Sequence, residues 1–229
     1  MTSANKEITV ICVSYKRYRH IHVLINAFLC QTLDNWKLLI IHDGHDEKME
    51  QLVGAYQKQH DNIQYMQTDQ RYNDYGHSLR EIGLHRADTK FLMFTNDDNY
   101  YAPKFLEYMF EAIRRDKLDL VLCNMIHSHK NPGKYKQEDY HLFDSYPKRK
   151  YVDMGNFIVR REQAQEVGFA DKPYTADGVF IDKLIERYNV VNLIGHWKWR
   201  LYLWLTQKKK AGARTLRVGK IDRVLLVHN

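Results

Sequence analysis

Cysteine and proline are both scarce in this chain of 229 residues, which contains 3 cysteines and 4 prolines. Cys12, Cys30 and Cys123 are far apart and odd in number, which excludes a disulfide framework and a cysteine-rich zinc site. All three lie in apolar runs, so we expect buried thiols in a reducing compartment. No run reaches the roughly 18 to 20 apolar residues of a membrane helix, and the N-terminal apolar stretch is too short for a signal peptide. A cytoplasmic protein is therefore expected.

Two motifs that bind metals or phosphates are also missing. The 12 histidines show no His-x-x-x-His spacing. No glycine-rich phosphate loop follows the first apolar segment, which argues against a nucleotidyltransferase. A metal or phosphate site would have to be assembled from residues far apart in the chain.

The positive charge is concentrated at one end of the chain. The formal net charge is +7, and residues 207–229 contain seven lysines and arginines against one aspartate. The rest of the chain is close to neutral, which disfavours a protein that binds nucleic acid over its whole surface. For the basic segment three alternatives stay open: a solvated face, a patch that contacts anionic lipids at the membrane periphery, or a flap over a bound phosphate. Before it, "HWKWRLYLWL" fits either a strand or an amphipathic helix on a membrane surface.

Apolar segments of two kinds alternate along the chain. Runs typical of buried strands are followed by segments with helical spacing, which predicts a mostly parallel α/β sheet flanked by helices. The expected strands are residues 7–15, 36–44, 62–69, 90–98, 118–126, the start of 151–169, and 189–195; the expected helices are 19–33, 47–60, 76–87, 103–116, the end of 151–169, and 175–188. Residues 127–150 interrupt the alternation and are expected to form a long loop.

Polar residues stand at the ends of three of these strands. The first strand ends in Ser14-Tyr15, the second in Asp43-Gly44, and the fourth in Asn96-Asp97-Asp98-Asn99. Ligands bind at the carboxyl ends of parallel strands, and adjacent carboxylates with amide neighbours suit Mg²⁺ or Mn²⁺. A divalent cation carrying a diphosphate would relieve the repulsion within the acidic pair. The alternative is that these residues only form turns.

Four blocks in order resemble family 2 glycosyltransferases of the GT-A fold. They are "TVICVSYKR…AFLCQTLDNWKLLIIHDGHDE", "GHSLREIGLHRADTKFLMFTNDDNYYAPKFLEYM", "MGNFIVRREQAQEVGF" and "ADGVFIDKL", and the resemblance runs from about residue 7 to residue 190. It implies a Rossmann-like GT-A domain over residues 1–195, with a nucleotide-binding half (1–99) and an acceptor half (100–195). Residues 196–229 would be a basic, aromatic C-terminal segment packed on that domain.

The resemblance also implies a role for particular residues. It places Tyr15, Asp43 and Asp97 at the nucleotide, with Asp43 on a uracil ring, and we also expect Ser14, Arg71 and Asn96 there from their positions near strand ends. Asp98 would bind Mn²⁺ or Mg²⁺, and His228 near the C-terminus is a candidate further ligand, the alternative being a solvated terminal histidine. Asp177 corresponds to the catalytic base of inverting members, although an aspartate in a first helical turn is also common for electrostatic reasons alone.

Other residues are left with open roles. Arg71 and Arg80 could face the base, the diphosphate or solvent. Tyr100 and Tyr101 could stack on sugar or pack against a helix. His127 and His129 are expected at the surface or as acceptor contacts.

The implied reaction moves a hexose from a UDP-sugar to a hydroxyl of a glycan or lipid-linked acceptor. Three departures from the family pattern bear on it: Ser14-Tyr15-Lys16 lacks a preceding proline, His42 replaces an acid, and Asn96 replaces the first acid of the Asp-x-Asp motif. The last change leaves a catalytically weak or inactive sugar- or nucleotide-binding module as the alternative.

Overall fold

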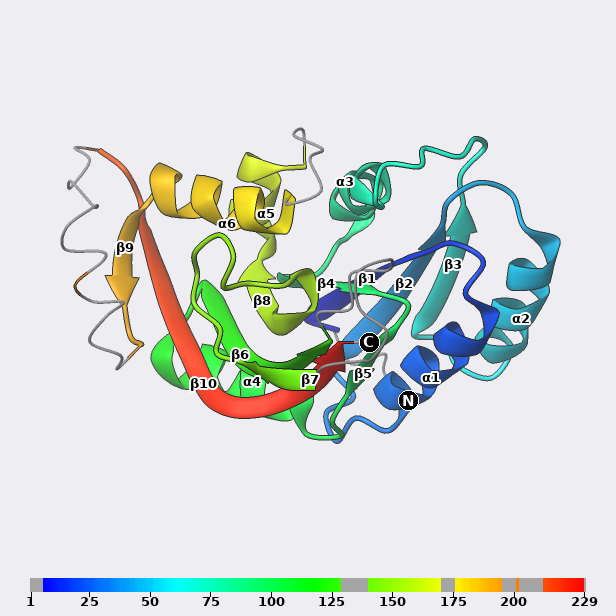
Figure 1. Cartoon of the computed structure of the whole chain (residues 1–229), viewed down its shortest axis with the longest axis horizontal. Helices are drawn as coiled ribbons and strands as arrows, with labels where there is room; N and C mark the ends of the chain where they lie inside the picture. The colour runs from blue at the N-terminus through cyan, green and yellow to red at the C-terminus, as the bar shows by residue number, and fades with distance from the viewer. Residues whose placement is uncertain (1–5, 129–139, 170–175, 195–200, 202–211, 229) are drawn as a thin grey trace.

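The computed structural model describes residues 6–128, 140–169, 176–194, 201 and 212–228 (Figure 1). The elements are β1 (Ile8–Ser14), α1 (Tyr18–Leu29), β2 (Trp36–His42), α2 (Glu47–Gln57), β3 (Ile63–Gln67), α3 (His77–Arg86), β4 (Phe91–Asn96), β5 (Asn99–Tyr101), α4 (Phe105–Asp116), β6 (Leu120–Ser128), β7 (Tyr140–Phe143), the 3₁₀ turn η1 (Met154–Asn156), β8 (Phe157–Arg160), α5 (Arg161–Val167), α6 (Ala176–Arg187), β9 (Asn189–Asn192) and β10 (Thr215–His228). No helix among these residues is long and apolar enough to cross a membrane.

One sheet runs through the described part of the chain. Its strand order is β3-β2-β1-β4-β8-β6-β10-β5, with β7 paired to β6 and β9 paired to β10. β1 is parallel to both β2 and β4, whereas β8 is antiparallel to β4 and β6. The chain adds strands on one side of β1 and then crosses to the other side with β4. The crevice between the carboxyl ends of β1 and β4 is therefore the place where an open α/β sheet binds ligands.

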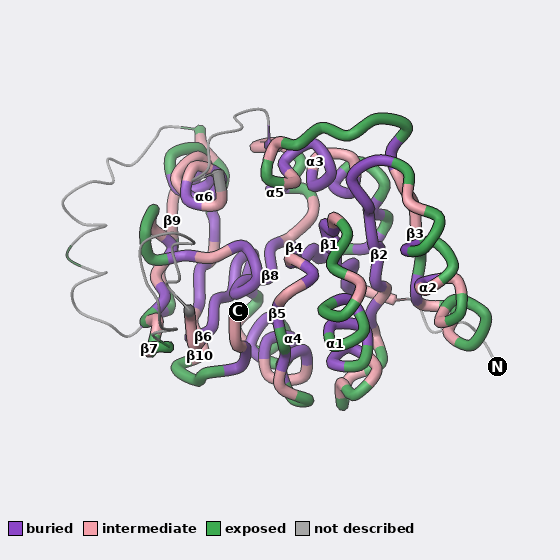
Figure 2. The backbone as a smooth tube through the Cα atoms, turned by 45° about the vertical axis from the view of Figure 1, so that its right-hand side comes forward, coloured by how far each residue is buried: buried purple, intermediate pink, exposed green. Residues whose placement is uncertain are grey.

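Helices cover both faces of this sheet, as the alternation predicted. α1, α2 and α4 contribute to the apolar core on one face, and α3, α5 and α6 to the core on the other. Every residue of β1 is buried, which is why its sequence is continuously apolar instead of alternating. α1 places Ile21, Leu24, Ile25 and Phe28 on one buried face, whereas the outer turns of α1 and α2 are exposed (Figure 2).

The last strand connects distant parts of the sheet. β10 is parallel to β9 at its start and to β6 along most of its length, and its end is antiparallel to β5. The register with β6 shifts between Ile221 and Val224 and again between Val224 and Leu226. Such irregularities bend a strand. The end of β10 therefore reaches the acidic pair, which directly precedes β5.

Several predictions made from the sequence are wrong in detail. Cys30 is exposed, because it follows the last turn of α1, whereas Cys12 and Cys123 are buried as expected. Residues 127–150 are not one long loop, since β6 continues to Ser128 and β7 pairs with it. The sequence also gave no sign of β5, whose Tyr101 is fully buried.

Parts of the basic C-terminal segment can be placed. Lys220 and Arg217 lie in β10, where Lys220 is largely buried and contacts Asp144, and Arg217 donates to the Asp116 carbonyl. For these two residues a solvated face is wrong. The lysines at 208–210 and His129 lie outside the described residues. So does all of "HWKWRLYLWL" apart from Leu201.

Candidate active site

The polar strand ends predicted from the sequence meet at the crevice between β1 and β4. Ser14 ends β1 and its hydroxyl donates to a carboxylate oxygen of Asp97, which follows β4, at 2.6 Å. The two residues are 83 positions apart in the chain, so the contact depends on the parallel pairing of β1 with β4. It fixes the acidic pair at the ligand-binding edge of the sheet.

The two carboxylates have different surroundings. Burial raises the pKa of Asp97 to about 7, and the neighbouring charge of Asp98 adds to the rise. Arg17 lies against both acids: its guanidinium donates to Asp98 Oδ2 and lies 3.7 Å from Asp97 Oδ1. Asp98 Oδ1 is buried and accepts no hydrogen bond from the described residues. A buried oxygen of this kind fits a ligand to a cation, because leaving it without a partner is costly.

Asn96, the residue that replaces an acid of the family motif, accepts a hydrogen bond from Arg80 at 2.6 Å. Arg80 is only 4% exposed, and it also donates to the backbone carbonyl of Tyr75. Of the alternatives left open for Arg80, solvent is therefore wrong. Burial lowers the pKa of Arg80, and the negative charges of Asp177 and Asp153 oppose that change. The amide at position 96 therefore gives this buried arginine an uncharged acceptor.

An aromatic surface forms beside the acidic pair, at the end of β1. The guanidinium carbon of Arg71 lies 3.9 Å from the centre of the Tyr15 ring, and the ring of His42 stacks on Tyr15 at 5.8 Å. His42 Nε2 accepts from the backbone of Lys16 at 3.0 Å, and Nδ1 lies 2.8 Å from the Gly44 carbonyl. The histidine that departs from the family pattern thus connects the ends of β1 and β2. An ionised acid could accept from Lys16 but could not donate to the Gly44 carbonyl.

Asp43 contacts the polypeptide itself. Its two carboxylate oxygens accept from the backbone nitrogens of Tyr72 and Asn73 at 2.7 and 3.0 Å. These bonds hold the segment that carries Arg71 beside Tyr15. In this structure Asp43 therefore shapes the wall of the crevice.

Asp177 lies in the first turn of α6. Its Oδ1 accepts from the backbone nitrogen of Gly178 at 2.7 Å. Burial raises the pKa of Asp177 to about 6, with the charge of Asp153 acting in the same direction and that of Arg80 against it. A carboxylate with a pKa near 6 is suited to take up a proton at neutral pH.

His228 lies at the end of β10 and not in solvent, which makes the alternative of a solvated terminal histidine wrong. Its Nδ1 lies 3.5 Å from Asp153 Oδ2, and its ring stacks on that of His127. Burial lowers the pKa of His228, but contact with Asp153 and the charge of Asp98 raise it, and the net pKa is raised. His127, expected at the surface or at an acceptor, is half-buried in this cluster.

Four residues of the site carry no assigned role in the sequence prediction: Arg17, Arg80, Asp153 and His127. Asp153 precedes a short 3₁₀ turn, and Arg17 lies in the turn after β1, where charged residues are ordinary. A predicted position next to a strand end could have indicated Arg17 and His127, whereas Arg80 lies within a helix and Asp153 precedes a strand.

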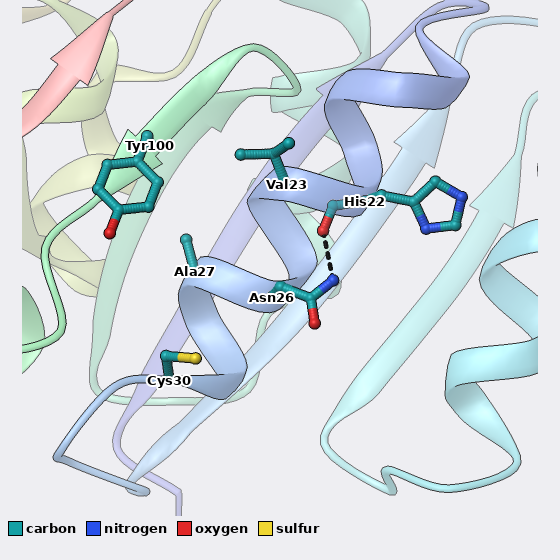
Figure 3. A pocket seen from close by; sticks show the side chains of 6 residues that line it. All are labelled: His22, Val23, Asn26, Ala27, Cys30 and Tyr100. Atoms are coloured by element: carbon teal, nitrogen blue, oxygen red, sulfur yellow. Dashed lines mark hydrogen bonds between the residues drawn. The ribbon is translucent and has the colours of Figure 1, made fainter.

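Two surface hollows lie where α1 faces β5. The first, of about 360 Å³, is lined by His22, Val23, Asn26, Ala27, Cys30 and Tyr100. Val23 and Ala27 face Tyr100 across it, and the His22 ring points away (Figure 3). The second, of about 290 Å³, shares Val23 and Tyr100 and extends to Asp98 and Tyr140. Tyr100 thus lines a surface hollow, whereas Tyr101 belongs to the core.

The family model described as glycosyl transferase family 2 matches residues 9–173. EpsH of Bacillus subtilis strain 168 is 23% identical over 146 residues, which cover 63% of this chain and 41% of EpsH. The uncharacterized glycosyltransferase EpsJ of the same organism is 21% identical over 192 residues, which cover 80% of this chain and 50% of EpsJ. The matched parts thus make up half or less of the length of these curated relatives.

Solved structures with the same fold include S. aureus TarS 1–349 in complex with UDP, which has a TM-score of 0.66, is 15% identical, and is matched over 96% of this chain and 60% of its own. The complex of TarS 1–349 with UDP-GlcNAc has a TM-score of 0.62 at 18% identity, over 78% of this chain and 53% of TarS. Mannosyltransferase PcManGT from Pyrobaculum calidifontis, in complex with GDP-Man and Mn²⁺, has a TM-score of 0.63 at 13% identity. The match covers 99% of this chain and 57% of PcManGT. The expectation of a GT-A-like α/β fold is confirmed.

Proposed function

The chain belongs to glycosyl transferase family 2, and from this premise we propose that it moves a sugar from a nucleotide-diphosphate sugar to an acceptor hydroxyl, with inversion at the anomeric carbon. What carries the proposal most is that one buried residue, Arg80, bonds the residue before the acidic pair and also interacts electrostatically with Asp177. Arg80 donates to Asn96 beside the pair, and its charge acts on Asp177. A metal-binding group and a proton acceptor are thereby close to one crevice.

The donor nucleotide would lie across the ends of β1, β2 and β4. Tyr15, supported by Arg71, presents a ring on which a base can stack. Ser14, Asn96 and Asp97 would face the ribose and phosphates. We propose a uracil base, since TarS of the same fold is in complex with UDP and with UDP-GlcNAc. The alternative base is guanine, because PcManGT is in complex with GDP-Man.

Asp98 would hold a divalent cation, Mn²⁺ or Mg²⁺, with His228 as a further ligand. The buried Asp98 Oδ1, which has no hydrogen-bond donor among the described residues, supports this assignment. When bound, such an ion acts as a Lewis acid that neutralises charge on the leaving diphosphate. Arg17 would have to leave Asp98 when the ion binds, and its half-exposed side chain could then turn toward the phosphates.

Asp177 would take the proton from the acceptor hydroxyl. General-base catalysis typically contributes about 10² to 10⁴-fold, and it is most effective when the pKa of the base is near the working pH. With one base placed opposite the leaving group, the displacement is single, which is why inversion is expected. The transferred sugar would be a hexose, and the acceptor a glycan or a lipid-linked molecule approached at the membrane periphery.

Release of UDP from a UDP-sugar, measured with and without Mn²⁺, tests the proposal. We expect slow release without acceptor, dependent on the metal and lost in Asp98→Asn. Thermal shifts with UDP-sugars and GDP-sugars identify the nucleotide, because only a bound donor stabilises the fold. Binding of the donor with no turnover for any acceptor tested would favour the inactive module, which the contact of Arg17 with Asp98 also favours.

A further inference from the structure

Two histidines face each other across β6 and β10. The register of this parallel pair places His127 opposite His228, so that the two side chains emerge on the same face of the sheet. Their rings are stacked, with centres 4.6 Å apart and an angle of 4° between the planes. Both residues are half-buried. The pairing of two strands that are about 100 residues apart in sequence therefore fixes two imidazoles side by side.

A carboxylate completes this cluster from a third element. Asp153 precedes η1, and its Oδ1 accepts from the backbone nitrogen of Gly155 at 2.8 Å. Its Oδ2 is directed at His228 Nδ1, 3.5 Å away, which is longer than an ordinary hydrogen bond. One oxygen thus anchors the side chain to the turn, while the other is aimed into the cluster.

The spacing of the three side chains suits one ion. One ligand atom from each of His127, Asp153 and His228 lies within 4.8 Å of the others. An ion pair of His228 with Asp153 explains two of these residues. The stacked ring of His127 adds a second imidazole to this pair, and the two rings would repel if both were charged. Two imidazoles and one carboxylate are, however, a common ligand set for a transition-metal ion that keeps positions open for substrate.

We propose that His127 and Asp153 join His228 in binding the divalent ion that Asp98 would hold, and that this nitrogen-containing set selects Mn²⁺-class and Zn²⁺-class ions over Mg²⁺. Mg²⁺ takes oxygen ligands and gives up water reluctantly, whereas imidazole suits transition metals. The inference rests on the proposed function, in which Asp98 and a donor diphosphate would bind the same ion. His228 makes this connection, because it pairs with Asn99, the residue after Asp98.

Metal binding to the full chain without nucleotide tests the site directly. Free Mn²⁺ is followed by electron paramagnetic resonance during titration, and Zn²⁺ and Mg²⁺ are then added as competitors. His127→Phe keeps an aromatic ring in the stack, and Asp153→Asn keeps an acceptor for Gly155. His85→Gln is the matched control, since His85 is 65% exposed and pairs with Glu81 on α3. Melting temperatures without metal establish that each variant is folded. If His127→Phe does not fold, His127→Gln is used in its place.

We expect the native chain and His85→Gln to bind one Mn²⁺, and each cluster variant to bind it at least about tenfold more weakly, as is typical for altered metal environments. Zn²⁺ should displace Mn²⁺, and a large excess of Mg²⁺ should not. Native affinity in both cluster variants together with loss in Asp98→Asn would overturn the proposal, as would equal binding of Mg²⁺ and Mn²⁺. If Mn²⁺ binding depends on the cluster while no nucleotide sugar is ever turned over, the proposed function fails and the metal site stands.

Discussion

Arg17 donates to Asp98 from the turn after β1, although 81 residues separate the two in sequence. The same guanidinium nitrogen lies 3.7 Å from Asp97 Oδ1. An arginine therefore supplies positive charge to the acidic pair, for which the sequence suggested only a metal ion. Because the Arg17 side chain is 49% exposed, it can move away without disturbing the core.

Arg17→Gln should bind Mn²⁺ more tightly than the native chain. Removing the guanidinium removes a competitor for Asp98, and we expect a gain of a few-fold to about tenfold, the latter equal to about 1.4 kcal/mol. Mn²⁺ titration without nucleotide measures it. Arg19→Gln, which removes the same charge from an exposed position on α1, is the control. Weaker Mn²⁺ binding by Arg17→Gln than by Arg19→Gln would contradict the competition.

Asp177→Asn should bind a nucleotide sugar normally and lose transfer by about 10² to 10⁴-fold, because the amide cannot accept the acceptor's proton. In the native chain the rate should rise with pH through about 6, the pKa to which burial raises Asp177. Initial rates between pH 5 and 8, with calorimetric donor binding, separate the two effects. Native transfer rates in the variant would remove Asp177 from the reaction.

The same substitution should make the fold more stable at pH 8. Asp177 keeps its proton up to a pKa of about 6 when folded, compared with 3.8 as its usual value, so folding is favoured at low pH and stability falls as the pH rises between these values. Asparagine has no charge to bury. Melting temperatures of both proteins should differ at pH 8 and converge near pH 4; a difference independent of pH would exclude this cause.

Asp43→Ala should destabilise the chain by about 1 to 3 kcal/mol, because the backbone nitrogens of Tyr72 and Asn73 lose their acceptor. Donor affinity should fall as well, since this segment holds Arg71 against Tyr15. Denaturant unfolding and donor titration measure the two effects. Asp43→Asn keeps one acceptor oxygen, so its stability and donor affinity should lie between those of the native chain and of Asp43→Ala. Weak donor binding with unchanged stability would indicate direct contact with the base.

Gly83→Ala and Gly54→Ala should change stability in opposite directions. A Cβ at Gly83 would lie 2.5 Å from Ile11 Cγ2 on β1, and such overpacking costs about 1 to 3 kcal/mol. A Cβ at Gly54 on α2 meets no atom within 4 Å, and alanine favours a helix by about 1 kcal/mol over glycine. Denaturant midpoints measure both. Equal effects at the two positions would show that α3 can shift away from β1.

The sequence predicted those parts of the fold that depend on local periodicity. Buried parallel strands such as β1 are continuously apolar, and α1 shows one apolar face, so both could be located from their residues. β5 could not, because its three residues are ordered by pairing with β10, far along the chain.

For the site, the acidic pair could be placed at the edge of the sheet because it follows an obvious strand. Arg17, which contacts the pair, and Arg80, which contacts the preceding Asn96, could not be assigned a role. Arg80 lies in a helix where an exposed arginine would give the same pattern, and Arg17 meets Asp98 only once β1 and β4 are adjacent. The cluster of His127, Asp153 and His228 likewise depends on the register of β10, which local pattern does not encode.

The position of β10 between β6 and β5 has a consequence for synthesis on the ribosome. Until residues 215–228 emerge, β6 and β5 each have an unpaired edge, and such edges invite association with other chains. Pairing of Asn99 with His228 also closes a very long loop, and contacts of this kind form late and slowly. A nascent or prematurely terminated chain would therefore be prone to aggregate and unable to bring His228 to His127 and Asp153.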